Sequence, residues 1–177
     1  MIHLLRSRRS TRKFTEEKIE PEKIQLLEEA VLRSPASKNG NPWEFIFVDD
    51  TKLIQQLGQA KPHGSAFVAE APLAVVVLAD ENKGEVWVED CSIASILLQL
   101  TAHSLNLGSC WVQIRNRPHN DHQTAEEFIQ QLFQLPKSLR VLSIVAVGYP
   151  AKNREGKPFK ELQQEKIHRN QYHPSES

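Results

Sequence analysis

Hydrophobic positions along the chain recur at helical spacing in some stretches and form β-prone or continuous apolar runs in others. Apolar residues between positions 24 and 31 fall on one helical face. That helix begins at Pro21, which suits a first helical turn, and ends before Pro35, because a residue that precedes proline is pushed out of the helical region. Further helices are predicted at residues 2–7, 51–57, 66–70 and 125–133, the last capped by Thr124.

Four stretches are predicted to be strands. Residues 43–48, 109–114 and 139–147 are rich in β-branched and aromatic side chains. Residues 71–79 are apolar without alternation, which indicates a strand covered on both faces. Strands and helices mix along the chain, so the sequence predicts an α+β fold in one domain.

The largest apolar element is a predicted helix from about Val88 to Leu105. Its apolar positions, which include Ile93 and Ile96, cover more than one face, so we expect it to be the central helix of the core. Gly108 is the expected left-handed residue that ends this helix.

The composition is that of an ordinary globular protein, with 40% hydrophobic and 25% charged residues in 177. We expect a single domain over residues 1–177, with a polar, basic C-terminal arm from about residue 151. The 22 basic and 22 acidic residues balance, which argues against nucleic acid as a partner. No apolar run is long enough to span a bilayer, and the N-terminus lacks a signal-peptide core, so no membrane partner is expected.

The two cysteines, Cys91 and Cys110, form no CxxC pair and cannot make a disulfide framework. A reducing cytoplasm is therefore the expected compartment. His119 and His122 lie close together in a polar segment, but a loop pair of this kind is usually solvated, and no metal site is predicted.

Positive charge is concentrated between Arg6 and Lys13 in this otherwise neutral chain. Guanidinium groups present their donors in a planar fork that matches phosphate oxygens, and the intervening hydroxyls can donate between them. The segment therefore fits one compact dianion. Taken alone, a short basic run is more often a solvated face, and this alternative is open until the rest of the chain is considered.

Three further motifs accompany the basic one. Residues 34–45 form a turn that ends in Pro-Trp-Glu-Phe, residues 107–113 follow the long helix, and residues 147–150 precede the basic tail. In this order and at this spacing, the four motifs resemble the nitroreductase family of FMN-dependent oxidoreductases over almost the whole chain. The resemblance implies an α+β sandwich, a mixed sheet flanked by helices, that works as an intertwined homodimer with FMN at the subunit interface.

The resemblance also implies which residues surround the cofactor. Arg8, Arg9, Ser10 and Arg12 would hold the ribityl chain and phosphate; Pro35, Ala36 and Ser37, from the partner subunit, would line the ring, with Asn39 nearby; Trp111, Val112, Gln113 and Ile114 would pass along its opposite side, one backbone N–H facing the flavin; and one or two of Arg154, Lys157 and Lys160 would close on the phosphate.

The implied activity is transfer of electrons from NADH or NADPH, through FMN, to a nitroaromatic, a quinone or a similar small electrophile. The chemistry would belong to the cofactor, which agrees with the lack of a Ser-His-Asp or paired-carboxylate arrangement, so no catalytic side chain is predicted. Gln113 stands where relatives often carry an acidic residue. The alternative function is an FMN- or phospho-ligand-binding module of the same fold without reductase turnover.

Overall fold

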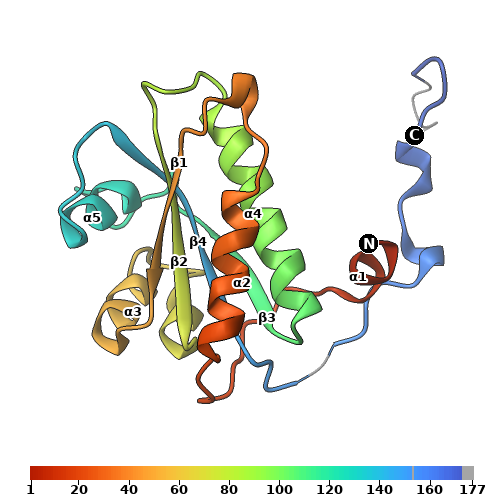
Figure 1. Cartoon of the computed structure of the whole chain (residues 1–177), viewed down its shortest axis with the longest axis horizontal. Helices are drawn as coiled ribbons and strands as arrows, with labels where there is room; N and C mark the ends of the chain where they lie inside the picture. The colour runs from red at the N-terminus through yellow and green to blue at the C-terminus, as the bar shows by residue number, and fades with distance from the viewer. Residues whose placement is uncertain (153, 173–177) are drawn as a thin grey trace.

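The computed structural model describes residues 1–152 and 154–172 (Figure 1). Its centre is a sheet in the order β1-β2-β4-β3. The strands are β1 (Trp43–Val48), β2 (Leu73–Asp80), β3 (Gly108–Gln113) and β4 (Leu139–Gly148). The α-helices are α1 (Ile2–Ser7), α2 (Pro21–Leu32), α3 (Thr51–Gly58), α4 (Trp87–Ser104) and α5 (Ala125–Leu132). The 3-10 helices are η1 (Ser37–Asn39), η2 (Ala66–Glu70), η3 (Phe159–Glu161) and η4 (Gln164–Lys166).

The predicted α+β class is confirmed, with one correction to the sheet. The pairs β1–β2, β2–β4 and β3–β4 all run antiparallel. Among the described residues, the parallel pairing expected of a mixed sheet is confined to the isolated bridge between Ser10 and Ser109. That bridge joins the basic N-terminal segment to β3, which is otherwise an edge strand.

Helices cover both faces of the sheet, and β2 is buried between them. Successive residues of β2 alternate between two hydrophobic clusters. One cluster holds Leu57 of α3 and Ile129 of α5, whereas the other holds Leu27 of α2 and Leu98 of α4. Covering on both faces explains why residues 71–79 are continuously apolar, as predicted.

The helix ends follow local chemistry. Asp50 caps α3 by accepting hydrogen bonds from the backbone N–H groups of Lys52 and Leu53, both at 2.9 Å. Thr124 and Glu127 form a capping box at the start of α5. These two starts agree with the helices predicted from the sequence.

The prediction for Gly108 is wrong. The left-handed residue after α4 is Asn106, with φ 63°, and Leu107 N–H donates to Ala102 O as in a Schellman ending. Gly108 is instead the first residue of β3. A Cβ there would lie 2.5 Å from the Thr11 side chain, so glycine is needed for the close approach of the N-terminal segment.

The central position of α4 is confirmed only for part of its surface. Its buried residues run from Trp87 to Ala102. Ile93 and Ile96, expected in the core, are 40% and 39% exposed, because no other described element packs over that side of the helix. An apolar strip formed by Ile93 and Ile96 is therefore open on α4.

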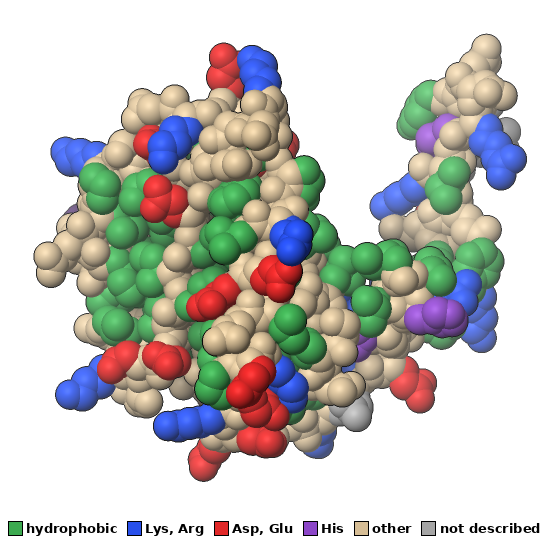
Figure 2. Space-filling view, in the orientation of Figure 1, with side chains coloured by type: hydrophobic (Ala, Val, Ile, Leu, Met, Phe, Trp, Pro, Cys, Tyr) green, Lys and Arg blue, Asp and Glu red, His purple; other side chains and the backbone are tan. Residues whose placement is uncertain are grey.

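Helix α1 and the C-terminal arm lie on the same side of the body, set off from the sheet (Figure 1). The C-terminal arm leaves β4, passes α1 and extends away from the body, and Figure 2 shows a wide hollow between the arm and the body. None of the described helices is long and apolar enough to cross a membrane.

Candidate functional site

The basic segment is threaded between the edge of β3 and the start of the C-terminal arm. Thr11 N–H donates to Ser109 O at 2.9 Å on the β3 side. On the arm side, Ala151 N–H donates to Lys13 O at 3.0 Å. The backbone of the segment is therefore fixed from both sides, and its side chains are presented at the point where α1, β3 and the arm meet.

A pocket of about 960 Å³ opens at this point. The predicted residues that line it are Arg8, Arg9, Ser10, Arg12, Arg154 and Lys157. Lys160 does not line the pocket; it lies exposed on η3. The rest of the wall is mostly apolar and is formed by Ile2, Leu5, Arg6, Pro158, Phe159 and Leu162. The structure thus brings the N-terminal cluster together with two of the three predicted basic residues of the arm.

These cations have no acidic partners. Among the described residues, no ion pair includes any arginine or lysine that lines the pocket. Arg8 Nη1 is buried and has no hydrogen-bond partner within the part of the chain that the structure describes. Leaving a buried charged donor unsatisfied is costly. Converging guanidinium groups and a hydroxyl with this unsatisfied donor fit the phosphate of FMN, which carries about two negative charges.

A second pocket of about 420 Å³ shares Arg8, Arg9 and Arg154 and adds His103 and Lys152. His103 lies in the last turn of α4, and sequence reasoning missed it because its link to the cluster spans 96 residues. The Ser7 hydroxyl donates to His3 O at 2.8 Å, so it accepts from His103 Nε2 at 2.7 Å. Burial, followed by the nearby Arg8 guanidinium, lowers the pKa of His103.

The predicted flavin-lining turn, at Pro35, Ala36, Ser37 and Asn39, lies away from the basic pocket. Ser37 N–H donates to Asp90 Oδ1 at 3.0 Å, near the N-terminal end of α4. The basic cluster contacts the other end, at His103. Asp90 and His103 are 13 positions apart, which corresponds to about 20 Å along a helix axis. One chain therefore does not bring the turn and the basic cluster together.

The predicted strand residues divide into two kinds. Val112 and Ile114 are buried in the core, at 1% and 0% exposure, and Ile114 N–H already donates to Leu142 O. Trp111 and Gln113 lie on the other face, where Trp111 Nε1 donates to Gln113 Oε1 at 3.0 Å. The side chains of Val112 and Ile114 therefore cannot line a ligand site.

The backbone of β3 has an open edge. Ser109 C=O accepts from Thr11, on the side away from β4. Backbone groups of alternate strand residues point to the same side, so the N–H groups of Trp111 and Gln113 also point to this outer edge. They are the backbone donors that a ligand beside the basic cluster could reach.

Cys110 lies beside this edge but is not suited to nucleophilic chemistry. It is 2% exposed, and burial raises the pKa of its thiol above the ordinary value. Among the described residues, no group of three or more His, Cys, Asp or Glu side chains is arranged to hold a metal ion.

Comparison with known proteins settles the family. The sequence profile of the nitroreductase family matches residues 5–61 and 55–149. The chain belongs to the nitroreductase family. The resemblance inferred from the four motifs is therefore confirmed.

The relatives of this nitroreductase-family chain include solved and curated proteins. An FMN-dependent nitroreductase from Clostridium difficile R20291 superposes with a TM-score of 0.95 at 39% identity, over 97% of this chain and 100% of that one. A Methanothermobacter thermautotrophicus protein, provisionally named an NADH dehydrogenase/NAD(P)H nitroreductase, is 33% identical over 86% of this chain and 78% of its own length. The FMN reductase [NAD(P)H] of Bacillus subtilis is 27% identical over 89% of this chain and 69% of its own.

Proposed function

We propose that this protein is an FMN-dependent oxidoreductase that takes electrons from NADH or NADPH and passes them to a small electrophile, such as a nitroaromatic compound or a quinone. The names of the relatives agree with this cofactor and this donor. The buried cysteines are free, which suits the reducing cytoplasm that we propose as its compartment.

The observation that carries the proposal is the group of pocket cations that form no ion pair among the described residues and that surround the buried Arg8 Nη1. In this proposal, Arg8, Arg9 and Ser10 bind the FMN phosphate, and Arg154 and Lys157 close over it from the arm. Charge-assisted hydrogen bonds from guanidinium to phosphate are among the strongest in proteins. Bound FMN would supply the electron-transfer chemistry, so these residues bind and orient rather than react.

The same proposal assigns the β3 edge to the flavin ring. The outward backbone N–H groups of Trp111 and Gln113 would donate to its polar edge. The Gln113 side chain holds the Trp111 indole and also donates from Nε2 to Arg115 O at 3.0 Å, so it keeps this edge rigid. Arg12, whose guanidinium lies 5.8 Å from the centre of the Phe67 ring, would add a fixed positive charge nearby.

We further propose that the active unit is a homodimer of single-domain subunits. The turn at residues 35–39 lies at the opposite end of α4 from the basic cluster. A second chain whose α4 runs antiparallel to the first would therefore bring its own turn to this cluster. The apolar strip of Ile93 and Ile96 on α4 is open for such packing. Phe159 and Ile167 of the arm are 71% and 75% exposed, as expected of an arm that packs on a partner.

The function can be tested by the visible spectrum of the purified protein. We expect a flavin spectrum, either as purified or after FMN is added, that bleaches anaerobically with NADH or NADPH and recovers when a nitroaromatic or a quinone is added. Colourless protein that takes up no FMN would refute the proposal. A flavin spectrum that neither nicotinamide bleaches would favour the binding module instead.

The dimer can be tested by sedimentation combined with FMN titration. We expect two chains and two FMN molecules in each particle. A monomer that binds FMN with full affinity would contradict the two-chain site while leaving the cofactor assignment intact.

A further inference from the structure

Asp90 is a buried carboxylate without a cationic partner. It is 3% exposed, and no described lysine, arginine or histidine forms an ion pair with it. Its Oδ1 accepts from Ser37 N–H at 3.0 Å, whereas Oδ2 is buried and has no hydrogen-bond partner in residues 1–152 and 154–172. Among the described groups, the charge is therefore compensated by this one N–H and by the N-terminal end of α4, where helix dipoles favour anions.

The turn that Asp90 contacts has an unusual backbone. Lys38, Asn39 and Asn41 have φ values of 52°, 54° and 42°, which place three side-chain-bearing residues in the left-handed region. Each such residue costs free energy, so this conformation persists only where the surroundings impose it. Among the described residues, the Ser37–Asp90 hydrogen bond is the one that joins residues 35–41 to another element.

We propose that Asp90 is a positioning residue for the flavin. It holds the backbone of the turn at a fixed place on α4, through Ser37 N–H, so that residues 35–39 line the ring of the FMN bound mainly by the partner subunit. Asp90 does not touch the flavin itself. The inference rests on the proposed function, which supplies the flavin, and on the contact above, which supplies the mechanism.

Three variants separate the parts of this proposal. Asp90→Ala removes the acceptor, and Asp90→Asn keeps an acceptor oxygen of the same size without the charge. Ser37→Pro removes the donor N–H; the preceding residue, Ala36, is already extended at φ −135° and ψ 152°, as a residue before proline must be. The control is Glu89→Gln, because Glu89 is exposed on the same helix and its side chain forms no hydrogen bond or ion pair among the described residues.

FMN affinity is the first readout. Asp90→Ala and Ser37→Pro are each expected to weaken FMN binding at least about tenfold, since each breaks a buried charge-assisted hydrogen bond. The double variant should be no weaker than the worse single variant, because both act through one contact. Asp90→Asn should stay within about threefold of the wild type, and Glu89→Gln should not change affinity.

The visible circular dichroism of the bound flavin is the second readout. In Asp90→Ala saturated with FMN, the spectrum should change, because the groups that line the ring have moved. A purely structural role would lower thermal stability and leave the spectrum of the saturated protein unchanged. If Asp90→Ala does not fold, Ser37→Pro gives the same two readouts.

The outcomes distinguish this inference from the proposed function. Wild-type protein that binds no FMN refutes the function. Wild-type protein that binds FMN, with an Asp90→Ala variant of equal affinity and unchanged dichroism, overturns the positioning role alone. Effects of Asp90→Ala and Ser37→Pro that add in the double variant would also overturn it.

Discussion

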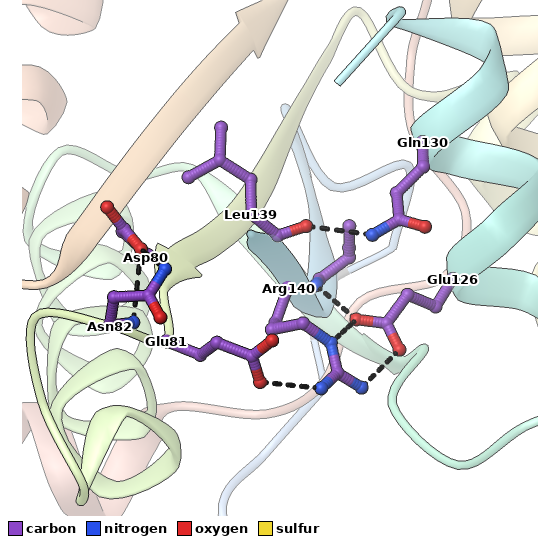
Figure 3. A network of polar contacts seen from close by, with 8 residues as sticks. Asp80, Glu81, Asn82, Glu126, Gln130, Leu139 and Arg140 are labelled. Atoms are coloured by element: carbon purple, nitrogen blue, oxygen red, sulfur yellow. Dashed lines mark hydrogen bonds and ion pairs between the residues drawn. The ribbon is translucent and has the colours of Figure 1, made fainter. Parts of the chain in front are cut away.

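Arg140 and the arginines that line the pocket have opposite surroundings. Arg140, on β4, is enclosed by acids: Nε and Nη2 donate to the two carboxylate oxygens of Glu126, both at 2.9 Å, and Nη1 donates to Glu81 at 2.8 Å (Figure 3). These carboxylates raise the pKa of Arg140 further above its ordinary value. Arg8, Arg9 and Arg12 face a pocket and have no acidic partner among the described residues.

The difference shows how the same side chain serves either the fold or a ligand. Glu126 also accepts from Val141 N–H at 2.8 Å, and Gln130 Nε2 donates to Leu139 O at 2.9 Å, so the Arg140 network joins α5 to β4 (Figure 3). Its donors are satisfied without any ligand. Arg8 Nη1, by contrast, is buried and has no hydrogen-bond partner among the described residues, so an anion that accepts from it would remove an unfavourable contact.

The largest effect is expected from Arg8→Ala. Because Arg8 Nη1 has no hydrogen-bond partner among the described residues, its removal should not destabilise the cofactor-free protein, but it should weaken FMN binding by about tenfold to a hundredfold. FMN titration followed by fluorescence, beside thermal unfolding of the cofactor-free protein, measures both quantities. Unchanged affinity would contradict the phosphate site.

Arg140→Ala should give the reverse pattern. It leaves Glu126, whose side chain is 13% exposed, without its ion-pair partner, and should lower the free energy of unfolding by about 2 kcal/mol. FMN affinity of the folded fraction should not change, because Arg140 does not line the pocket. Denaturant unfolding gives the first quantity. A loss of FMN affinity as large as that of Arg8→Ala would contradict the assignment of Arg140 to the fold and of the pocket arginines to the ligand.

A smaller effect is expected at His103, which shares the second pocket with Arg8. Burial and the Arg8 guanidinium hold its folded-state pKa below the ordinary 6.5, so the contribution of His103 to stability is fully present above pH 6.5 and is lost as the pH falls from 6.5 through the folded-state pKa. A bound dianion should offset the repulsion from Arg8 and raise the pKa of His103. NMR titration with and without FMN measures this shift, with exposed His63 as the internal control. An unchanged His103 pKa would show that the dianion binds away from this pocket.

Most elements of the fold could be predicted because their signals are local. Pro21, Asp50 and Thr124 mark helix starts through contacts within a few residues, and the unbroken apolar run in β2 reflects covering on both faces. The basic motif could also be read directly, since it requires only that like charges lie close in the chain. Family membership followed from the order of such local motifs.

Long-range contacts decided the rest. The sequence by itself determined the elements and the concentration of cations, because periodicity, capping and charge act over a few residues. The tertiary structure decided that Arg154 and Lys157, but not Lys160, line the pocket, that Gly108 makes room for Thr11, and that Asp90 holds Ser37 across 53 residues. These outcomes depend on how helices and strands pack, and packing brings together side chains that no local pattern relates.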